Sequence, residues 1–226
     1  NYTTTILEDN AGIIWIGSEN GISKFDRFKL KFPHFKHHQS NPDGLSNNFV
    51  TAILQDQSSI LWVGTQDGGL NKFDPQKNGF IHYKHDPNNL ESIGEGTIYS
   101  LIEDKKGRIW IGTQNGGLNR FHPETETFIH YQHKVGVKNS LSSNFVWPIY
   151  EDTKGFLWIG TWGGGLNKFN PETEQFFHYK RDPDNTNSLS NDQLSSIIED
   201  SAGNIWVGTF QGLNLYPQQS KFFFLL

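Results

Sequence analysis

The stretch EDTKGFLWIGTWGGGLNKFNPETEQFFHYKRD, residues 151–182, decides the fold because the chain repeats it. The pattern [IL]-W-[IV]-G-[ST] occurs five times, at Trp15, Trp62, Trp110, Trp158 and Trp206. The spacings between these tryptophans are 47, 48, 48 and 48 residues. An Asp-x-x-Gly turn precedes four of them, and the second copy has Ser59 in place of the glycine. Repeats of this length indicate a solenoid, a propeller or another array.

Each repeat has the pattern of four short strands. In the second repeat we expect them at residues 50–56, 60–65, 69–73 and 80–84. These runs are rich in β-branched and aromatic residues, and Gly, Pro, Asn or Asp bound them. No segment keeps the 3.6-residue period of a helix. Four-stranded units of about 40–50 residues are typical of β-propeller blades, so the sequence predicts an all-β propeller.

The chain holds five such units and four long connections between them. We therefore expect a single domain over residues 1–226, with blades at approximately 1–47, 48–95, 96–143, 144–191 and 192–226. The expected architecture is a closed ring of five four-stranded antiparallel blades. It has no shared velcro strand, since every unit supplies its own four strands. An excerpt of a larger ring also fits the count, but it would expose two apolar blade faces. The chain has no Met, so we expect a processed or excised piece or an engineered one.

Composition excludes several classes of protein. The 226 residues carry 24 acidic and 19 basic side chains, so no basic excess exists to neutralise nucleic-acid phosphates. The absence of Cys excludes a disulfide scaffold and a cysteine zinc site. No apolar run approaches the length of about 20 residues that spans a bilayer. We expect a monomer with no nucleic-acid partner and no membrane insertion by this chain.

Positions that are the same in every repeat are expected to serve the blade. The repeated tryptophan suits packing between blades. The Asp of the turn (Asp9, Asp56, Asp104, Asp152, Asp200) suits a turn cap, because a catalytic acid is needed once or as a pair. Structural calcium at this turn is the alternative, and no other cofactor is expected. His82, His130 and His178 recur on the outermost strand, where they should not converge on one metal.

Functional residues are expected where the repeats differ. The loops between the second and third strands vary at Glu19, Asn20, Gln66, Asp67, Gln114, Asn115, Trp162, Phe210 and Gln211. Amides can bind sugar hydroxyls, and a flat aromatic ring can stack on the C–H face of a pyranose. Trp162 stands where two sister loops have glutamine, so packing does not require a large ring there. The alternative is that these residues only fill the loops.

The first strand of each unit varies at its second position. Tyr99 and Trp147 stand where three other units have Thr or Ser. If this strand is innermost, alternate side chains line the channel, and the two rings could form one aromatic wall. Filling of the channel is the alternative. Pro148 predicts a bulge or an unpaired edge.

The ordered motif ED-x-x-G-x-[IL]-W-[IV]-G-T-x-x-G-G-L-N resembles the two-component regulator propeller repeat, most clearly at residues 103–123 and 151–171. The resemblance covers nearly the whole chain. It implies an extracytoplasmic, periplasmic sensor domain that recognises an oligosaccharide. It also implies a transmembrane histidine kinase as the partner in a parent protein.

Three functions follow from these patterns. The first is a non-catalytic propeller that binds an oligosaccharide-like ligand on the loop face around the channel. The second is a structural or engineered scaffold without a natural ligand. The third is a five-bladed glycoside hydrolase or lyase. A hydrolase needs two acids near each other, and Glu19, Asp67, Glu91 and Glu95 show no clear pairing.

Overall fold

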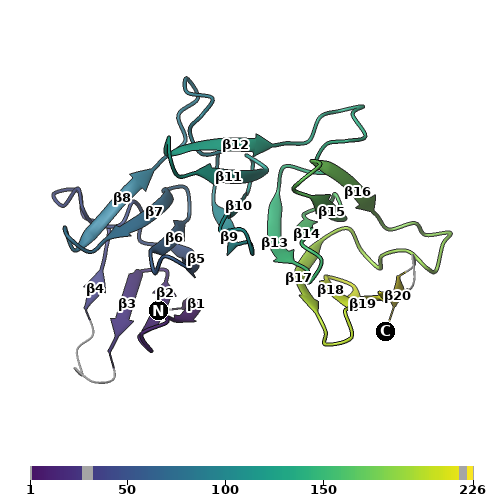
Figure 1. Cartoon of the computed structure of the whole chain (residues 1–226), viewed down its shortest axis with the longest axis horizontal. Helices are drawn as coiled ribbons and strands as arrows, with labels where there is room; N and C mark the ends of the chain where they lie inside the picture. Colours follow the sequence, from purple (N-terminus) through teal and green to yellow (C-terminus); the bar gives the residue numbers. More distant parts are fainter. Residues whose placement is uncertain (1, 27–32, 219–222, 226) are drawn as a thin grey trace. The chain divides into compact units, whose positions relative to one another are not determined.

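The computed structural model describes residues 2–26, 33–218 and 223–225. These residues form twenty strands and no helix (Figure 1). The all-β class expected from the repeat is therefore confirmed. Asn1 and Leu226, the ends of the first and last predicted blades, lie outside the described residues.

The strands form five antiparallel sheets of four, which we call blades, and each blade pairs its strands in chain order. Blade 1 holds β1 (Thr3–Glu8), β2 (Ile14–Ser18), β3 (Gly21–Phe25) and β4 (His34–Phe35). Blade 2 holds β5 (Val50–Gln55), β6 (Leu61–Thr65), β7 (Gly69–Asp74) and β8 (Gly79–Tyr83). Blade 3 holds β9 (Ile98–Glu103), β10 (Ile109–Thr113), β11 (Leu118–His122) and β12 (Thr127–Tyr131). Blade 4 holds β13 (Val146–Glu151), β14 (Leu157–Thr161), β15 (Leu166–Asn170) and β16 (Gln175–Tyr179). Blade 5 holds β17 (Leu194–Glu199), β18 (Ile205–Thr209), β19 (Gly212–Tyr216) and β20 (Phe224–Leu225).

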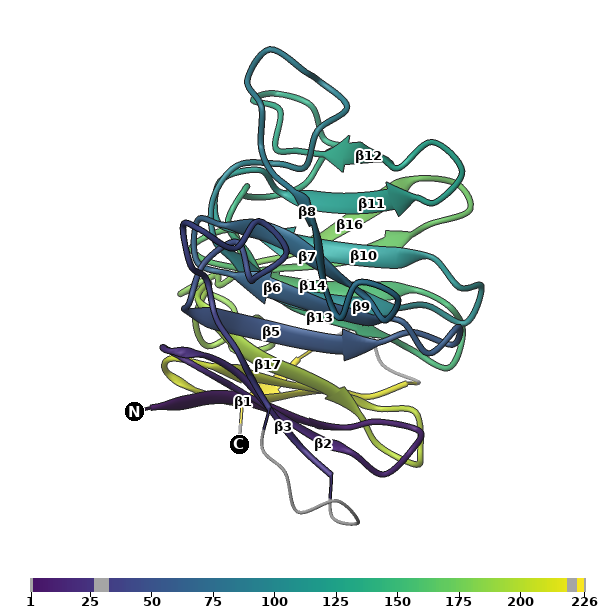
Figure 2. The ribbon, with the colours of Figure 1, turned by 90° about the vertical axis from the view of Figure 1, so that its left-hand side faces the viewer.

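The strand assignments agree with the sequence to within one residue in the second repeat. Each blade also keeps all four strands to itself, so no strand is shared between blades. Figure 2 shows β5, β6 and β7 side by side as one sheet. The meander arises because each connection within a blade is a short turn, which joins antiparallel neighbours.

The chain divides into two compact units. The first unit contains Asn1–Ile111 and Asn119–Ile129, and the second contains Gly112–Leu118 and His130–Leu226. Blade 3 therefore contributes to both units. The single closed ring over residues 1–226 stays a prediction.

The repeated tryptophan packs between blades, as predicted. In the first unit the Trp15 ring lies 6.1 Å from Phe73 of the next blade, and the Trp62 ring lies 5.1 Å from Phe121. In the second unit Trp158 lies 5.4 Å from Tyr216. Aromatic pairs at these distances add about 0.5–1.5 kcal/mol beyond the area that they bury. The aromatic positions of the repeat thus form the core at the junction of one blade with the next.

The glycine of the same motif makes room for the next blade. A Cβ built on Gly64 would lie 2.6 Å from Cγ2 of Ile98 at the start of β9. A Cβ on Gly112 would lie 2.7 Å from Cγ1 of Val146 on β13. Side chains cannot approach that closely. The glycine on the second strand of one blade therefore allows the first strand of the next blade to pack directly against it. This explains why Trp and Gly recur together.

The first strand is bulged in four blades. The register shifts between Thr3 and Thr5, between Val50 and Ala52, between Val146 and Ile149, and between Leu194 and Ser196. The bulge predicted at Pro148 is confirmed. It also occurs without proline, so Pro148 is accommodated by a bulge that belongs to the repeat, where a missing N–H is tolerated.

Candidate functional site

The repeated turn aspartate is a cap, as the sequence predicted. In blade 4 the Oδ1 atom of Asp152 accepts hydrogen bonds from the backbone N–H groups of Lys154 and Phe156. Its Oδ2 atom accepts a 2.8 Å hydrogen bond from Nε1 of Trp158. The bond from tryptophan to aspartate recurs in all five blades at 2.8–2.9 Å. The aspartate and the tryptophan that recur in every repeat are therefore hydrogen-bonded to each other within each blade.

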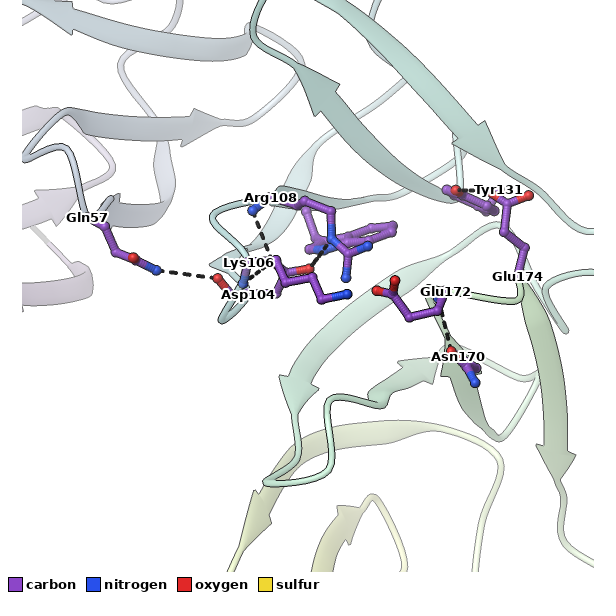
Figure 3. A network of polar contacts seen from close by, with 9 residues as sticks. Gln57, Asp104, Lys106, Arg108, Tyr131, Asn170, Glu172 and Glu174 are labelled. Atoms are coloured by element: carbon purple, nitrogen blue, oxygen red, sulfur yellow. Dashed lines mark hydrogen bonds and ion pairs between the residues drawn. The ribbon is translucent and has the colours of Figure 1, made fainter.

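Blade 3 adds a cation to this arrangement. The guanidinium of Arg108 forms an ion pair with Asp104, which also accepts the Trp110 indole N–H (Figure 3). Burial acts to raise the pKa of Asp104, but hydrogen bonds from Trp110 and Arg108 outweigh it and lower that pKa. The carboxylate is therefore held in its charged form as a structural group.

The variable loop residues of the first unit lie at the surface. Glu19, Gln66 and Asp67 are exposed, and Asn20 is half-buried. Asp67 has a φ of 52° and accepts a 3.2 Å hydrogen bond from the Thr97 hydroxyl, so it joins its loop to the segment just before β9. Tyr99 lies half-buried on β9 in the same unit.

The second unit gathers four aromatic side chains. Trp162, in the loop after β14, lies 5.8 Å from Phe145, 6.0 Å from Trp147 and 4.9 Å from Phe210. The Phe145 and Trp147 rings stack with Trp162 at 22° and 28°, whereas Phe210 meets it edge-on at 75°. Trp147 and Phe210 are also 6.3 Å apart. We call Phe145, Trp147, Trp162 and Phe210 the aromatic cluster.

The aromatic cluster is reachable from solvent. Phe210 is 55% exposed, and the other three rings are half-buried. Large rings that only filled a core would be covered, as Trp62 and Trp158 are. The structure thus brings together three predicted residues, Trp147, Trp162 and Phe210. Tyr99 lies in the other unit, so the predicted wall of Tyr99 and Trp147 stays a prediction.

The backbone fixes the position of Trp162. Its N–H donates a 3.0 Å hydrogen bond to the carbonyl of Phe145. The same bond occurs in three sister loops, from Glu19 to Tyr2, from Gln66 to Phe49 and from Phe210 to Gln193. The main chain of this loop is therefore set by the repeat, and only the side chain is variable. This is the arrangement that a recognition position requires.

Two glycines complete the Trp162 loop. Gly163 and Gly165 have φ values of 82° and 76°, which favour glycine. Both donate backbone hydrogen bonds to the carbonyl of Asp192, at 3.0 and 3.1 Å. The three-glycine run of this loop serves to fold it back onto the next connection.

The remaining predicted residues of the second unit are not in the aromatic cluster. Asn115 and Gln211 are exposed, and Gln114 is half-buried. Two connection asparagines act as turn caps, since Asn47 accepts from the N–H of Phe49 and Asn191 from that of Gln193, at 2.8 and 2.7 Å. Asn144 accepts from the N–H of His133 at 2.7 Å and so joins the two ends of its connection.

Sequence comparison missed two features. Phe145 belongs to the aromatic cluster, but it lies just before the first strand of blade 4, outside the loops and the strand position that were compared. The asparagine of the Gly-Leu-Asn sequence at the start of the third strand was also overlooked. Asn71, Asn167 and Asn214 are fully buried, and each accepts a backbone N–H from the incoming connection at Ser46, Ser142 or Ser190. The signal was its recurrence in four repeats.

No group of three or more His, Cys, Asp or Glu that could hold a metal ion occurs among the described residues. The predicted strand histidines have structural contacts instead: the ring nitrogens of His82 and His178 lie 2.7 and 2.8 Å from backbone carbonyls of the preceding connections. In the part of the chain that the structure describes, no helix is long and apolar enough to cross a membrane.

The family model described as "Two component regulator propeller" matches residues 1–20, 44–67, 92–115, 140–163 and 188–211. These five matches fall on the five repeats and cover just over half of the chain. The chain therefore belongs to the two-component regulator propeller family, and its fold is a β-propeller with five blades. A comparison with curated proteins found no match.

Solved structures with this fold include two domains from B. thetaiotaomicron. The extracellular domain of BT3049, described as a hybrid two component system, is 26% identical with a TM-score of 0.82. The alignment covers 99% of this chain and 29% of that one. The extracellular domain of BT4673, described as a one component system, is 24% identical with a TM-score of 0.77, over 100% of this chain and 31% of that one. The chain thus spans less than a third of these relatives, and both are extracellular, in agreement with the extracytoplasmic localisation expected.

A more distant neighbour is an enzyme. Virginiamycin B lyase from Staphylococcus aureus is 16% identical with a TM-score of 0.68, over 98% of this chain and 69% of that one. An identity this low shows the shared fold alone.

Proposed function

We propose that the chain is the non-catalytic ligand-binding part of an extracytoplasmic sensor, and that the aromatic cluster binds an oligosaccharide. The single observation that carries the proposal is the cluster itself. Phe145, Trp147, Trp162 and Phe210 meet at one end of blades 4 and 5, and the rings are accessible.

The chemistry of the cluster suits a neutral sugar. Tryptophan offers a broad apolar face at a small cost in conformational entropy, and such rings dominate the affinity of many binding sites. The neighbouring backbone is held by hydrogen bonds that recur in sister loops, so the rings are positioned before a ligand arrives. Preorganisation of this kind lowers the entropy lost on binding.

The proposal extends to the parent protein. The structural relatives are extracellular domains of regulatory systems, and this chain covers less than a third of each. We place the chain in the periplasm as part of a longer receptor, with a transmembrane histidine kinase as its partner. Ligand binding would change signalling only through segments of that receptor other than these blades.

The test uses a substitution that the repeat itself supplies. Gln66 and Gln114 occupy the place of Trp162 in sister blades, so Trp162→Gln should fold normally. The wild-type chain is screened on an array of neutral oligosaccharides, and hits are measured by calorimetry. We expect Trp162→Gln to weaken binding by about 30-fold or more, the effect of losing a central aromatic anchor.

Phe177→Ile is the matched control. Phe177 is also a large ring, 51% exposed, but it lies on β16, where blades 2 and 3 have Ile81 and Ile129. This variant should bind as the wild type does. Equal affinity of Trp162→Gln and the wild type would remove the aromatic cluster from the site. An array without any hit would favour a scaffold role.

A further inference from the structure

A pocket of about 370 Å³ lies in the first unit, between blades 1 and 2. It sits at the turns that join the first and second strands, which is the end of the strands opposite to the variable loops. Asp9 and Trp15 contribute from blade 1. The ends of β5, β6 and β7 and the turns next to them contribute from blade 2. The pocket is therefore separate from the aromatic cluster.

The pocket has an apolar floor and a polar rim. Trp15 and Leu61, each only 4% exposed, form the floor with the half-buried Ile60 and Phe73. Ser58 and Ser59 are exposed and form part of the rim.

The other polar groups of the wall are already engaged. The Oδ2 atom of Asp9 accepts the Trp15 indole N–H, and its Oδ1 atom accepts two backbone N–H groups. The Gln55 side chain accepts a 2.7 Å hydrogen bond from the N–H of Asn10. The two serine hydroxyls are thus the groups that remain to bind a ligand.

The same place between blades 4 and 5 is nearly closed. There the pocket has a volume of about 70 Å³, and it is lined by counterparts of the same positions, including Asp152, Trp158, Gly203 and Tyr216. The two junctions share the turn aspartate and the tryptophan, so we attribute the difference in volume to the residues that the repeat lets vary.

Two exchanges account for the larger pocket. Lys154 stands where blade 1 has Ala11, and its long side chain lines the small pocket. Gln218 stands where blade 2 has Pro75, and the Gln218 side chain would lie 2.7 Å from a Cβ on Gly203. Short residues at both places leave the space between blades 1 and 2 unfilled.

The rim also carries a strained residue. Ser59 has a φ of 64°, a conformation that four sister turns give to glycine: Gly12, Gly107, Gly155 and Gly203. The left-handed conformation costs a residue with a Cβ about 1–2 kcal/mol. Strain of this kind concentrates at ligand sites, where the side chain has a use that offsets the cost. The serine at position 59 places a hydroxyl beside the apolar floor.

We propose that this pocket is a second ligand site, which takes a compact neutral molecule with an apolar ring and one hydroxyl or amide group. The ring packs on Trp15, Ile60 and Phe73, and the polar group bonds to Ser58 or Ser59. The volume lies within the lower part of the range for small-molecule sites, about 300–1,000 Å³. The site does not depend on the sugar-binding role of the aromatic cluster.

The test uses 4-fluorophenol as the probe and NMR as the measurement. The indole N–H of Trp15, assigned with Trp15→Phe, should shift saturably as the probe is added. The double variant Ala11→Lys with Pro75→Gln places the residues of the small pocket in the large one. We expect it to weaken binding by about 10-fold or more, because the ring can no longer reach the floor.

Ala202→Lys, the same change at the equivalent place of blade 5, is the control and should bind the probe as the wild type does. Ser58→Ala combined with Ser59→Gly should weaken the binding of 4-fluorophenol by about 5-fold, because one hydrogen bond is lost. The same double variant should bind fluorobenzene, which has no hydroxyl, as the wild type does. The absence of a saturable shift at Trp15, or equal binding by the filled variant, would overturn the proposal. Neither result bears on Trp162, so this test fails or succeeds apart from the sugar test.

Discussion

At the scale of single residues, the bond between aspartate and tryptophan recurs in all five blades. It satisfies the only polar atom of a ring that packs between blades, and it ends the first strand with a capped turn. In blade 5 this arrangement is less buried than in blade 4, because Trp206 is half-buried and Trp158 is 1% exposed. The cap therefore does not need full burial to form.

The carboxyl group of Asp200 should make stability depend on pH. Hydrogen bonds from Trp206 and Asn204 lower the pKa of Asp200 to about 2, against about 3.9 in an unfolded chain. A lowered pKa stabilises the fold above about pH 4, and this contribution is lost as the pH falls towards 2. We expect Asp200→Asn to have a lower Tm than the wild type at pH 6 and a smaller fall in Tm between pH 4 and pH 2, measured by calorimetry.

Asp184→Asn is the control for the pH experiment. Asp184 is exposed in the connection before blade 5, and its replacement should leave the fall in Tm between pH 4 and pH 2 as it is in the wild type. A fall as steep in Asp200→Asn as in the wild type would show that the hydrogen bonds to this carboxylate do not couple its titration to folding.

At the scale of strands and blades, the junction depends on close approach. The Gly64 backbone leaves room for Ile98, which begins the next blade. We expect Gly64→Ala to reduce the free energy of unfolding by about 1–3 kcal/mol, because overpacking forces the two blades apart. Ile98→Ala removes Cγ2, the nearer of the two Ile98 atoms that the new methyl group would meet, and leaves Cβ at 2.9 Å. The double variant should therefore lose less stability than the sum of the two single variants, as urea denaturation would measure.

Strict additivity of Gly64→Ala and Ile98→Ala would mean that the two positions do not touch in solution. Ile198→Ala in blade 5, far along the chain from this pair, provides a comparison for a change that should add independently to Gly64→Ala.

Most of the strands could be predicted from the sequence, but the contacts between blades could not. The strands of blade 2 agree with the expectation to within a residue, because turn residues and β-branched runs mark them locally. The contact of Gly64 with Ile98 was not predicted, since it joins residues of different blades. Phe145 was missed for another reason. Comparison of the repeats covered the loops and the second position of the first strand. Phe145 lies just before that strand, and its contact with Trp162 joins two segments that are apart in the chain.

At the scale of the whole molecule, the first and last blades expose apolar side chains at places that other blades bury. On β1, Ile6 is 66% exposed, whereas the equivalent Leu101 and Ile149 are buried. On blade 5, Ile198 and Leu213 are 60% and 42% exposed, whereas Leu166, the counterpart of Leu213, is fully buried. Faces that the repeat buries elsewhere are apolar surfaces that favour a partner.

The closed ring predicted from the sequence would cover these faces, and substitution can measure this. If Ile198 is covered in solution, Ile198→Ala should reduce the free energy of unfolding by about 2–4 kcal/mol, as for a core position. Leu54→Ala, at the equivalent place in blade 2, is the reference for a covered side chain.

Light scattering would then show whether Ile198 is covered by closure of the ring or by a second copy of the chain. A ring that closes on itself should have the monomer mass of about 26 kDa. A mass twice as large would assign the cover to a second copy. A cost below about 0.5 kcal/mol for Ile198→Ala, the usual effect of a surface substitution, would contradict closure.

One backbone hydrogen bond described for Trp162 has a consequence for how such proteins diverge. The bond fixes the loop at Glu19, Gln66, Trp162 and Phe210 alike, although these side chains are a carboxylate, an amide and two aromatic rings. A mutation at any of these places can exchange a carboxylate, an amide or an aromatic ring while the inherited main chain stays as it is. Each of these four loops is therefore a position where ligand specificity can change by substitution while the fold stays the same.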